Sequence, residues 1–272
     1  MFGWRSEGTG RGLRQSAYRL MVATRPECLC REEPDIWDSG EVSSEASIGI
    51  PYGGKPLDSA RTYYWTVRVR DGEGSLSGWS EMQRWATGLL NEDDWHAKWI
   101  GPSIESVSPS SPLLRKSFEV DDLSQVESAY MYATALGLYY LRCNGEEVSD
   151  RKFAPGWSDY RSHVRYQTYD VKSLLRTGEN AVGAVLGPGW YAGHIASFGD
   201  RKYGTHPAFL AQLVIRYTDG RRTTVVTDES WRIAEGPIRE ADLIQGETYD
   251  ARLERDGWDR PGFRDADWLP AT

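Results

Sequence analysis

Short runs of alternating polar and apolar residues constrain this chain more than any other feature. The clearest run is YYWTVRVR, residues 63–70. Its side chains fall on two faces, with Tyr63, Trp65, Val67 and Val69 on one and Tyr64, Thr66, Arg68 and Arg70 on the other. A period of two is that of a half-buried β-strand, and no helical stripe of comparable length occurs nearby. The pattern therefore predicts a protein built from antiparallel sheets.

Turn residues recur at short intervals through the first part of the chain. A second strand-like run, AYRLMVA, covers 17–23, and the turn signals are DSG at 38–40, PYGG at 51–54, DGEG at 71–74 and SGWS at 77–80. Short strands at this spacing are typical of a small antiparallel sandwich of about 90 residues. We expect the first domain to cover residues 1–92.

A polar stretch follows this first domain. NEDDWHAKWIGP at 91–102 and SIESVSPSSP at 103–112 are rich in Ser, Pro and charge and have no apolar periodicity. Such composition is typical of a domain junction, so the sequence predicts a linker over 93–112.

Strand-like runs resume beyond the linker. They are LLRKSFEV (113–120), ESAYMYATALGLYYLRCNG (127–145), RYQTYDV (165–171), NAVGAVLG (180–187), FLAQLVIRYTDG (209–220), RTTVVTD (222–228) and WRIAEGP (231–237). TDG at 218–220 predicts a hairpin with a type I′ turn, and VKSLLRTGEN at 171–180 predicts one helical turn that Gly178 ends. The second domain, 113–272, is expected to be a jelly roll, which makes the chain all-β with two β-sandwiches in series.

Composition excludes several classes of partner. The formal net charge is −8 and no Lys/Arg cluster stands out, so a nucleic-acid backbone would be repelled. No apolar run approaches the roughly 18 residues of a membrane span, and the start lacks the features of a secretory signal. Three cysteines, Cys28, Cys30 and Cys143, form neither a disulfide framework nor a zinc motif. These features together favour a cytoplasmic protein without nucleic-acid or membrane partners.

Two Pro-Gly-Trp segments are the most informative local feature. The first lies in PGWSDY, 155–160, and the second in VLGPGWYAGH, 185–194, where Gly and Pro force a sharp bend after the apolar run 181–186. Twelve Trp and fifteen Tyr against six Phe also favour aromatics with a polar group. The two tryptophans have two open interpretations: they close the end of a hydrophobic core, or they form a stacking platform for a sugar ring.

A sugar site needs an aromatic face for C–H groups and polar groups that bind neighbouring hydroxyls. The two segments supply both kinds if the strands 153–170 and 181–190 are neighbours, so that both loops emerge together. The candidate sugar-binding residues are Trp157, Asp159, Tyr160, Trp190, Tyr191, His194 and Tyr203. Neither a GxSxG elbow, a phosphate loop nor a strand-GxGxxG motif is present, and His163, His194 and His206 lack metal-ligand spacing.

Ten segments in order resemble the N-terminal part of bacterial α-L-rhamnosidases of glycoside hydrolase family 78. RQSAYRLMVA, IWDSGEVSS, YYWTVRVRDGEG, WSEMQRWATGLL and DWHAKWIGP are similar to the fibronectin III-like, immunoglobulin-type leader of that family. APGWSDYRSHVRYQTYDV, NAVGAVLGPGWYAGH, YGTHPAFLAQLVIRYTDG, TDESWR and GETYDAR are similar to the β-sandwich that follows it. Two departures are a first strand that is largely missing before Phe2, and Ile244 where relatives commonly have an aromatic residue.

The resemblance implies a galactose-binding-like jelly roll that in some relatives binds terminal rhamnose with a calcium ion, for which Asp159 is the candidate metal ligand here. It also implies two partners, a rhamnose-containing glycoside or oligosaccharide and an (α/α)6 catalytic barrel that is not within these residues. We therefore expect no catalytic residue in this chain and no required cofactor, with calcium as the one ion that the resemblance leaves open. The alternative is that both sandwiches only support and position the barrel, without binding sugar.

Glu247, Asp250 and Arg252 in GETYDAR form a secondary candidate site. Inverting glycoside hydrolysis needs two carboxyl groups roughly 6.5–9.5 Å apart, and the sequence does not measure that distance. The two acids have a simpler interpretation, in which they pair with Arg252 or face a neighbouring domain. We expect them to be structural rather than catalytic.

Overall fold

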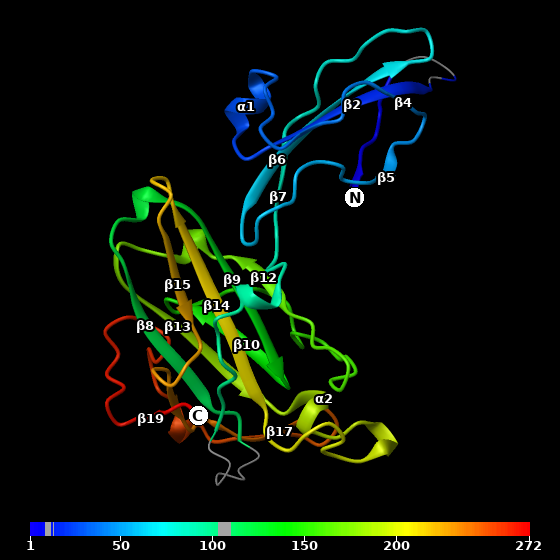
Figure 1. Ribbon diagram of the computed structural model, residues 1–272. Coiled ribbons are helices and arrows are strands. Elements are labelled where there is room, and N and C mark those ends of the chain that lie inside the picture. Colours follow the sequence, from blue (N-terminus) through cyan, green and yellow to red (C-terminus); the bar gives the residue numbers. More distant parts are fainter. Residues whose placement is uncertain (9–11, 13, 103–109) are drawn as a thin grey trace. The chain divides into compact units, whose positions relative to one another are not determined.

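Antiparallel strands make up almost all of the regular structure in the computed structural model, which describes residues 1–272 except 9–11, 13 and 103–109 (Figure 1). The prediction of an all-β chain is confirmed. Two units are distinguished, Met1–Glu92 and Asp93–Thr272. The α-helices of the described residues are short, α1 (Pro26–Cys30) and α2 (Gly189–Ala192), and none is long and apolar enough to cross a membrane.

The first unit contains a main sheet and a small accessory pair of strands. The main sheet has the order β3-β2-β6-β7, with β4 also paired to β2, and the accessory pair is β1-β5. The strands are β1 (Phe2–Gly3), β2 (Gln15–Ala23), β3 (Trp37–Asp38), β4 (Val42–Ser43), β5 (Ile48–Ile50), β6 (Thr62–Asp71) and β7 (Gln83–Ala86).

The core of this unit lies on one face of β6. Tyr63, Trp65, Val67 and Val69 all belong to it, as the alternation predicts. The ring of Phe2 fills the same core, with its centroid 5.0 Å from that of Trp65. The opposite face of β6 is also covered, because Thr66 is buried and its hydroxyl donates to the Ser80 carbonyl over 2.9 Å.

The second unit consists mainly of two antiparallel sheets that share one core. Their orders are β11-β10-β13-β8-β16-β19 and β12-β9-β14-β15, and a separate hairpin pairs β17 with β18. The strands are β8 (Leu113–Val120), β9 (Val126–Leu136), β10 (Leu138–Cys143), β11 (Glu146–Glu147), β12 (Gln167–Asp170), β13 (Gly178–Gly187), β14 (Ala208–Tyr217), β15 (Arg222–Val226), β16 (Arg232–Ala234), β17 (Ile238–Asp242), β18 (Gly246–Tyr249) and β19 (Leu269–Pro270).

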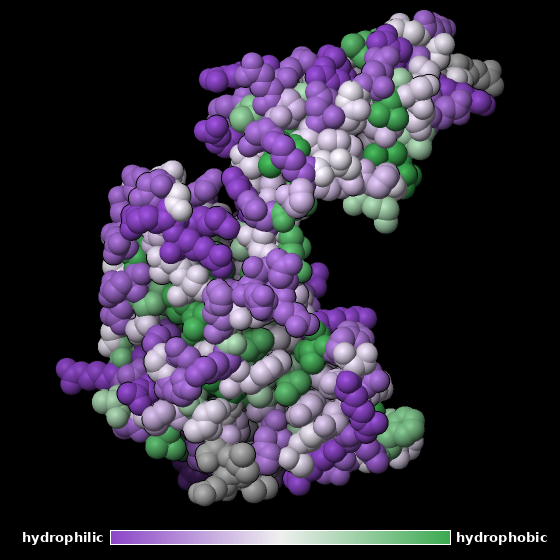
Figure 2. Space-filling model, viewed as in Figure 1, coloured by the Kyte–Doolittle hydropathy of each residue, from purple (hydrophilic) through white to green (hydrophobic). Residues whose placement is uncertain are grey.

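The shared core takes side chains from both sheets. Leu114 and Leu186 come from the six-stranded sheet, Met131 and Leu213 from the four-stranded one, and Trp231 is 1% exposed beside them. Each fully buried side chain of this size stabilises the fold by roughly 1.5–3 kcal/mol. Hydrophilic residues cover most of the face seen in the space-filling view, with small hydrophobic areas between them (Figure 2).

The passage from β9 to β10 depends on Gly137. This residue has φ of +128°, and a Cβ there would lie 2.3 Å from the carbonyl oxygen of Gly187. Glycine alone permits both the backbone angle and the close approach. The chain therefore crosses directly from one sheet to the other beside the end of β13.

The stretch predicted as a linker, 93–112, packs onto the second unit wherever it is described. Ile100 is buried and exchanges two backbone hydrogen bonds with Phe209, and the Lys98 N–H donates to the Thr227 carbonyl. The polar composition of the stretch conceals its buried residues, among them Ile100, Ser110 and Ser111. Residues 103–109 lie outside the described part of the chain.

Two local predictions are corrected in detail. The hairpin at 218–220 forms, but its turn is not type I′, because only Gly220 has positive φ and Tyr217 accepts a hydrogen bond from its N–H. This is the pattern of a longer loop in which Gly follows a type I turn. The helical turn is Lys172–Leu174, and Gly178, at φ of +86°, begins β13 rather than ending the turn.

Candidate functional site

The two Pro-Gly-Trp loops meet, although the strands next to them are not neighbours. β12 belongs to the four-stranded sheet and β13 to the six-stranded one, so the condition that 153–170 and 181–190 be neighbouring strands is not met. The loops meet through β10 instead. Leu138 pairs with Gly187 at the end of β13, and the next N–H, that of Tyr139, donates to the Ala154 carbonyl of the first loop.

Trp157 and Trp190 stack on one another where the loops meet. Their ring centroids are 6.2 Å apart and their planes differ by 7°. Phe153 packs on Trp190 with a centroid distance of 6.1 Å. Trp157 is 48% exposed and Phe153 is 59% exposed, whereas Trp190 is half-buried, and none of the three belongs to the sandwich core. These three residues form the aromatic surface of the second unit.

Three tyrosines form a second aromatic group beside it. The Tyr160 ring lies 5.3 Å from Tyr191 and 5.1 Å from Tyr203, centroid to centroid. Tyr191 fits because Gly204 has no side chain, since a Cβ there would lie 2.3 Å from the tyrosine hydroxyl. Burial raises the pKa of Tyr160 to about 12, and its hydroxyl has no hydrogen-bond partner among the described residues. This group packs internally more than it faces solvent.

Asp159 shapes the first loop. Its side chain accepts from the Arg161 N–H at 3.2 Å, and its carbonyl accepts from Ser162 and His163. Calcium requires six to eight oxygen ligands, typically with several carboxylates. The described residues contain no group of three or more His, Cys, Asp or Glu side chains that fits a metal ion, so Asp159 has no carboxylate cluster around it. A calcium ion at Asp159 would therefore take most of its ligands from backbone carbonyls and waters.

Asp242 holds His194, which lies two residues after the end of α2. Oδ2 of Asp242 accepts from the His194 N–H at 2.8 Å and lies 3.2 Å from its ring Nδ1. Oδ1 accepts from the N–H groups of Ile244 and Gln245, at 2.8 and 3.0 Å. A Cβ at Gly193 would come within 2.8 Å of Asp242 Oδ2, so glycine permits the approach. We call this arrangement the Asp242 clasp.

The clasp determines the charge of Asp242. Burial raises the pKa of this carboxyl, but the backbone N–H donors of His194, Gln245 and Ile244 outweigh it and lower the pKa to about 2. The ring of His194 has partners on both sides, because Gln245 Nε2 lies 3.1 Å from its Nε2. Asp242 therefore joins the tip of the β17–β18 hairpin to the end of α2.

Acid should weaken the clasp in a defined pH range. Because the folded-state pKa lies below the ordinary value of 3.8, the contribution of Asp242 to stability is complete above about pH 4 and is lost as the pH falls towards 2. We expect this contribution to be on the order of 1–2 kcal/mol after solvent screening. Urea unfolding of the wild type and Asp242→Asn across this range measures it.

The matched control for that experiment is Asp250→Asn. The hydrogen bonds from Arg252 lower the pKa of Asp250 to about 2 as well, but Arg252 is exposed. Asp250→Asn should therefore change stability less than Asp242→Asn. Added salt should remove the effect of Asp250→Asn, because the exposed pair with Arg252 is screened. Equal acid dependence in wild type and Asp242→Asn would contradict the assignment.

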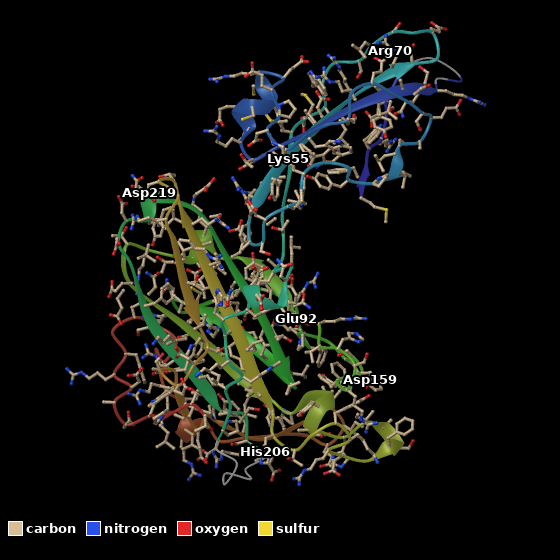
Figure 3. The ribbon with its side chains drawn as sticks, viewed as in Figure 1. Lys55, Arg70, Glu92, Asp159, His206 and Asp219 are labelled. Carbon is tan, nitrogen blue, oxygen red and sulfur yellow. The ribbon has the colours of Figure 1, made fainter. Side chains whose placement is uncertain are left out.

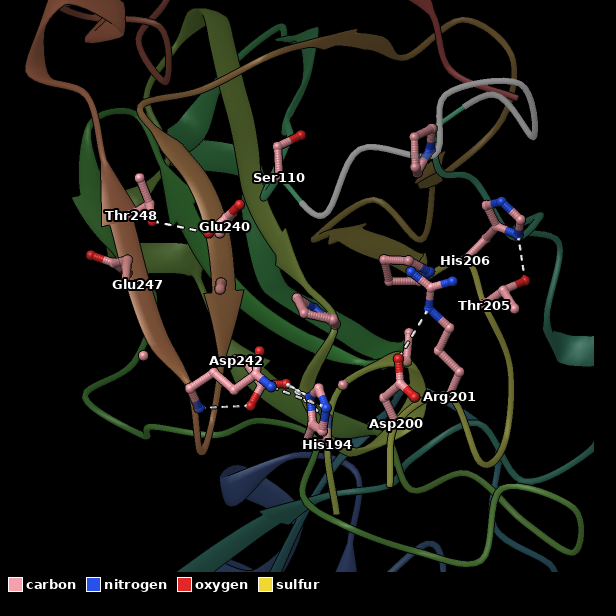
Figure 4. A pocket seen from close by; sticks show the side chains of 18 residues that line it. Ser110, His194, Asp200, Arg201, Thr205, His206, Glu240, Asp242, Glu247 and Thr248 are labelled. Carbon is pink, nitrogen blue, oxygen red and sulfur yellow. Dashed lines mark hydrogen bonds and ion pairs between the residues drawn. The ribbon is translucent and has the colours of Figure 1, made fainter. Parts of the chain in front are cut away.

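A pocket of about 330 Å³ lies beside the clasp, between the β17–β18 hairpin and the loop 200–206 (Figure 4). His194 and Asp242 line it together with Glu240, Asp200 and Arg201. Asp159 and His206 lie towards the same end of the second unit, and Asp219 lies towards the other (Figure 3). The pocket, formed by β17, β18 and the loop 200–206, and the aromatic surface, formed by the loop 153–157 and α2, thus both lie towards one end of the sandwich.

The two secondary candidate carboxylates, Glu247 and Asp250, lie in different surroundings. Asp250 binds Arg252 through two hydrogen bonds of 2.8 and 2.6 Å, which confirms the pairing interpretation for this residue. Glu247 contributes to the pocket wall, but its side chain points away from Asp242 and His194 (Figure 4). Neither carboxylate is placed opposite the other across a cavity of the described residues.

Sequence reasoning identified His194 but missed most of its surroundings. Asp242, Gln245 and Glu240 come from a segment far along the chain, Arg201 follows His194 by seven residues, and none stands in a recognisable motif. The backbone of Arg201 does mark this region, because Arg201 is a non-glycine residue with φ of +54°. Such conformations gather at functional sites, but they are visible only in a structure.

Both units match family models. Residues 124–272 match the model described as the α-L-rhamnosidase N-terminal domain, and residues 1–91 match the model of the N-terminal immunoglobulin domain of Rha78A-like proteins. Together the two matches cover nearly all of the chain.

Curated relatives align with almost the whole chain but are much longer. An α-L-rhamnosidase of Streptomyces avermitilis is 30% identical, over 98% of this chain and 42% of its own length. An α-L-rhamnosidase of Formosa agariphila is 36% identical, over 98% of this chain and 30% of its own length. The Streptomyces alignment spans 433 residues, so that relative has additional residues inside the matched region.

Solved structures of relatives have the same backbone fold as this chain. The Streptomyces avermitilis α-L-rhamnosidase complexed with L-rhamnose has a TM-score of 0.92 and 29% identity, over 99% of this chain and 42% of that one. The α-L-rhamnosidase of Dictyoglumus thermophilum has a TM-score of 0.89 and 35% identity, over 99% of this chain and 31% of that one. The chain spans less than half the length of each.

Proposed function

The chain belongs to the α-L-rhamnosidase N-terminal domain family, and on this premise we propose that it is the non-catalytic accessory region of an α-L-rhamnosidase. Its second unit binds terminal L-rhamnose or a similar neutral sugar. The partners of this region are a rhamnose-containing glycoside and the catalytic domain of the parent enzyme.

One observation supports sugar binding above the others, namely the aromatic surface of Phe153, Trp157 and Trp190. Stacked rings that stay half-exposed offer an apolar face to the C–H groups of a sugar ring. The loops that carry them are held by short backbone contacts to β10, so the surface exists before a ligand arrives. The nearby pocket adds carboxylate, imidazole and guanidinium groups that bind hydroxyls.

A purely structural role is the second candidate function, and the aromatic surface of Phe153, Trp157 and Trp190 also fits this role. Exposed aromatic rings also pack against protein neighbours, and the chain covers only 30–42% of its relatives. In that case the two units position a catalytic barrel and bind no sugar.

Isothermal titration calorimetry of this chain with L-rhamnose, with and without calcium, separates the two roles. The sugar-binding proposal predicts saturable heat at millimolar L-rhamnose that calcium does not change, because Asp159 lacks a carboxylate cluster. An absence of heat, together with no displacement by other neutral sugars, would leave the structural role.

Trp190→Ala should reduce sugar affinity more than it reduces stability. Loss of one stacking ring is expected to weaken binding of a rhamnose-containing oligosaccharide by roughly tenfold, about 1.4 kcal/mol. Because Trp190 is half-buried and outside the core, its truncation should cost less than the roughly 3–5 kcal/mol of a buried aromatic. Calorimetric titration and thermal unfolding of the same samples measure both effects.

Trp231→Ala is the matched control, because this tryptophan is 1% exposed in the core. It should lose the full 3–5 kcal/mol or so of a buried aromatic. If Trp190→Ala proves as destabilising as Trp231→Ala, the side chain is a core residue and the platform interpretation is wrong.

A further inference from the structure

The pocket beside the Asp242 clasp is separate from the aromatic surface. Ala192, Gly193 and His194 line it, whereas Trp157 and Trp190 do not. Its volume of about 330 Å³ lies within the usual range of small-molecule sites, roughly 300–1,000 Å³. It is therefore large enough for a ligand of its own.

The groups of the clasp form a rigid wall rather than a ligand-binding set. Asp242 already accepts from three backbone N–H groups, and both ring nitrogens of His194 have partners. A ligand would have to displace these bonds to use either residue. The binding groups must be others.

Glu240 and Arg201 retain hydrogen-bonding capacity and lie on opposite sides of the pocket (Figure 4). Oε2 of Glu240 accepts from the Thr248 hydroxyl at 3.1 Å, and within the described residues its Oε1 has no hydrogen-bond partner. Among the residues that the structure describes, the guanidinium of Arg201 has one ion-pair contact, with Asp200 at 3.6 Å, and both side chains are 51% exposed. One side thus offers an acceptor and the other offers donors.

The charges of the lining select the class of ligand. Asp200, Glu240, Asp242 and Glu247 contribute carboxylates and Arg201 contributes the guanidinium, so an anionic ligand meets net repulsion. A simple cation cannot accept hydrogen bonds from the guanidinium donors. Hydroxyl groups both donate and accept, so they satisfy Glu240 and Arg201 together. Apolar wall is supplied by three prolines, Pro102, Pro188 and Pro207.

We infer that this pocket seats one neutral monosaccharide ring, with hydroxyls bound between Glu240 and Arg201 and C–H groups against the prolines. The inference rests on the proposed sugar-binding function and assigns the ring to the pocket, while the aromatic surface contacts the group attached to it. Asp242 and His194 are positioning residues, because they hold the hairpin wall and do not touch the ligand.

Glu240→Gln tests the assignment, and Glu235→Gln is its matched control, because Glu235 is exposed, pairs with Arg239 and does not line the pocket. Glutamine keeps the shape of Glu240 and an acceptor for Thr248 but removes the charge that strengthens a hydroxyl hydrogen bond. We expect the affinity for L-rhamnose to fall roughly tenfold in Glu240→Gln and in Arg201→Ala, and to stay unchanged in Glu235→Gln. The readout is titration calorimetry of the full chain, with thermal unfolding of each variant.

The possible outcomes distinguish the two proposals. Wild-type binding that survives in Glu240→Gln and Arg201→Ala but is lost in Trp157→Ala would overturn the pocket assignment and leave the proposed function intact. No binding of L-rhamnose or of other neutral hexoses by the wild type would overturn both. Selective loss in the two pocket variants, with normal unfolding, supports the assignment.

Discussion

Arg115→Ala is expected to lower the free energy of unfolding by about 3–5 kcal/mol, because it removes a buried charge from a hydrogen-bonded network. Arg115 is 1% exposed on β8 and pairs with the Asp265 carboxylate. It also donates to the carbonyls of Trp258 and Arg260, at 2.8 and 3.2 Å. Alanine would leave a carboxylate and two carbonyls without these donors.

Chemical unfolding with guanidinium chloride measures this loss, and Lys116→Ala is the control. Lys116 is the next residue on β8 and its amino group bonds the exposed side chain of Ser230, so its removal should change stability by well under about 1 kcal/mol. Arg115→Ala should also increase amide exchange in the segment 258–265. A change as small as that of Lys116→Ala would show that this segment does not depend on Arg115.

Gly137→Ala is expected to destabilise the second unit by roughly 2–5 kcal/mol. The left-handed backbone at φ of +128° costs a non-glycine residue about 1–2 kcal/mol, and a Cβ placed 2.3 Å from the Gly187 carbonyl forces the backbone to shift. The displaced backbone leads into Pro188 and α2. The variant should therefore weaken sugar binding as well as lower the melting temperature.

Gly156→Ala separates the two causes in that prediction. Gly156 has φ of +95°, but a Cβ there would meet no atom within 4 Å, so it shows the backbone cost alone. Thermal unfolding of both variants should give a larger loss for Gly137→Ala. Equal losses would mean that the close approach of β9, β10 and β13 contributes nothing.

Strands were predictable from this sequence because alternation is a local property. The run 113–120 and β8 coincide, and the faces of β6 agree with the pattern in 63–70. Pairing was not predictable in the same way. β12 and β13, which follow one another in the chain, lie in different sheets, as do β9 and β10 on either side of Gly137. Alternation determines which side chains face inward and does not determine which strand lies alongside.

The candidate site shows the same division. Pro, Gly and Trp within a few residues indicate an aromatic segment at a bend, and the sequence alone identified both Pro-Gly-Trp segments. The clasp was not, because His194 and Asp242 are separated by 48 positions and a single aspartate at the tip of a hairpin has no distinctive pattern. Hydrogen bonds to backbone N–H groups depend on where the backbone passes, which sequence patterns do not reveal.

The Asp242 clasp has a consequence for the speed of binding. Three backbone N–H groups from two separate segments already converge on one carboxylate, so the hairpin wall needs no rearrangement when a small molecule enters. Association should then follow a single concentration-dependent phase, without the slower step that accompanies the ordering of a loop. Differences in affinity among related sugars would appear as differences in how long each stays bound.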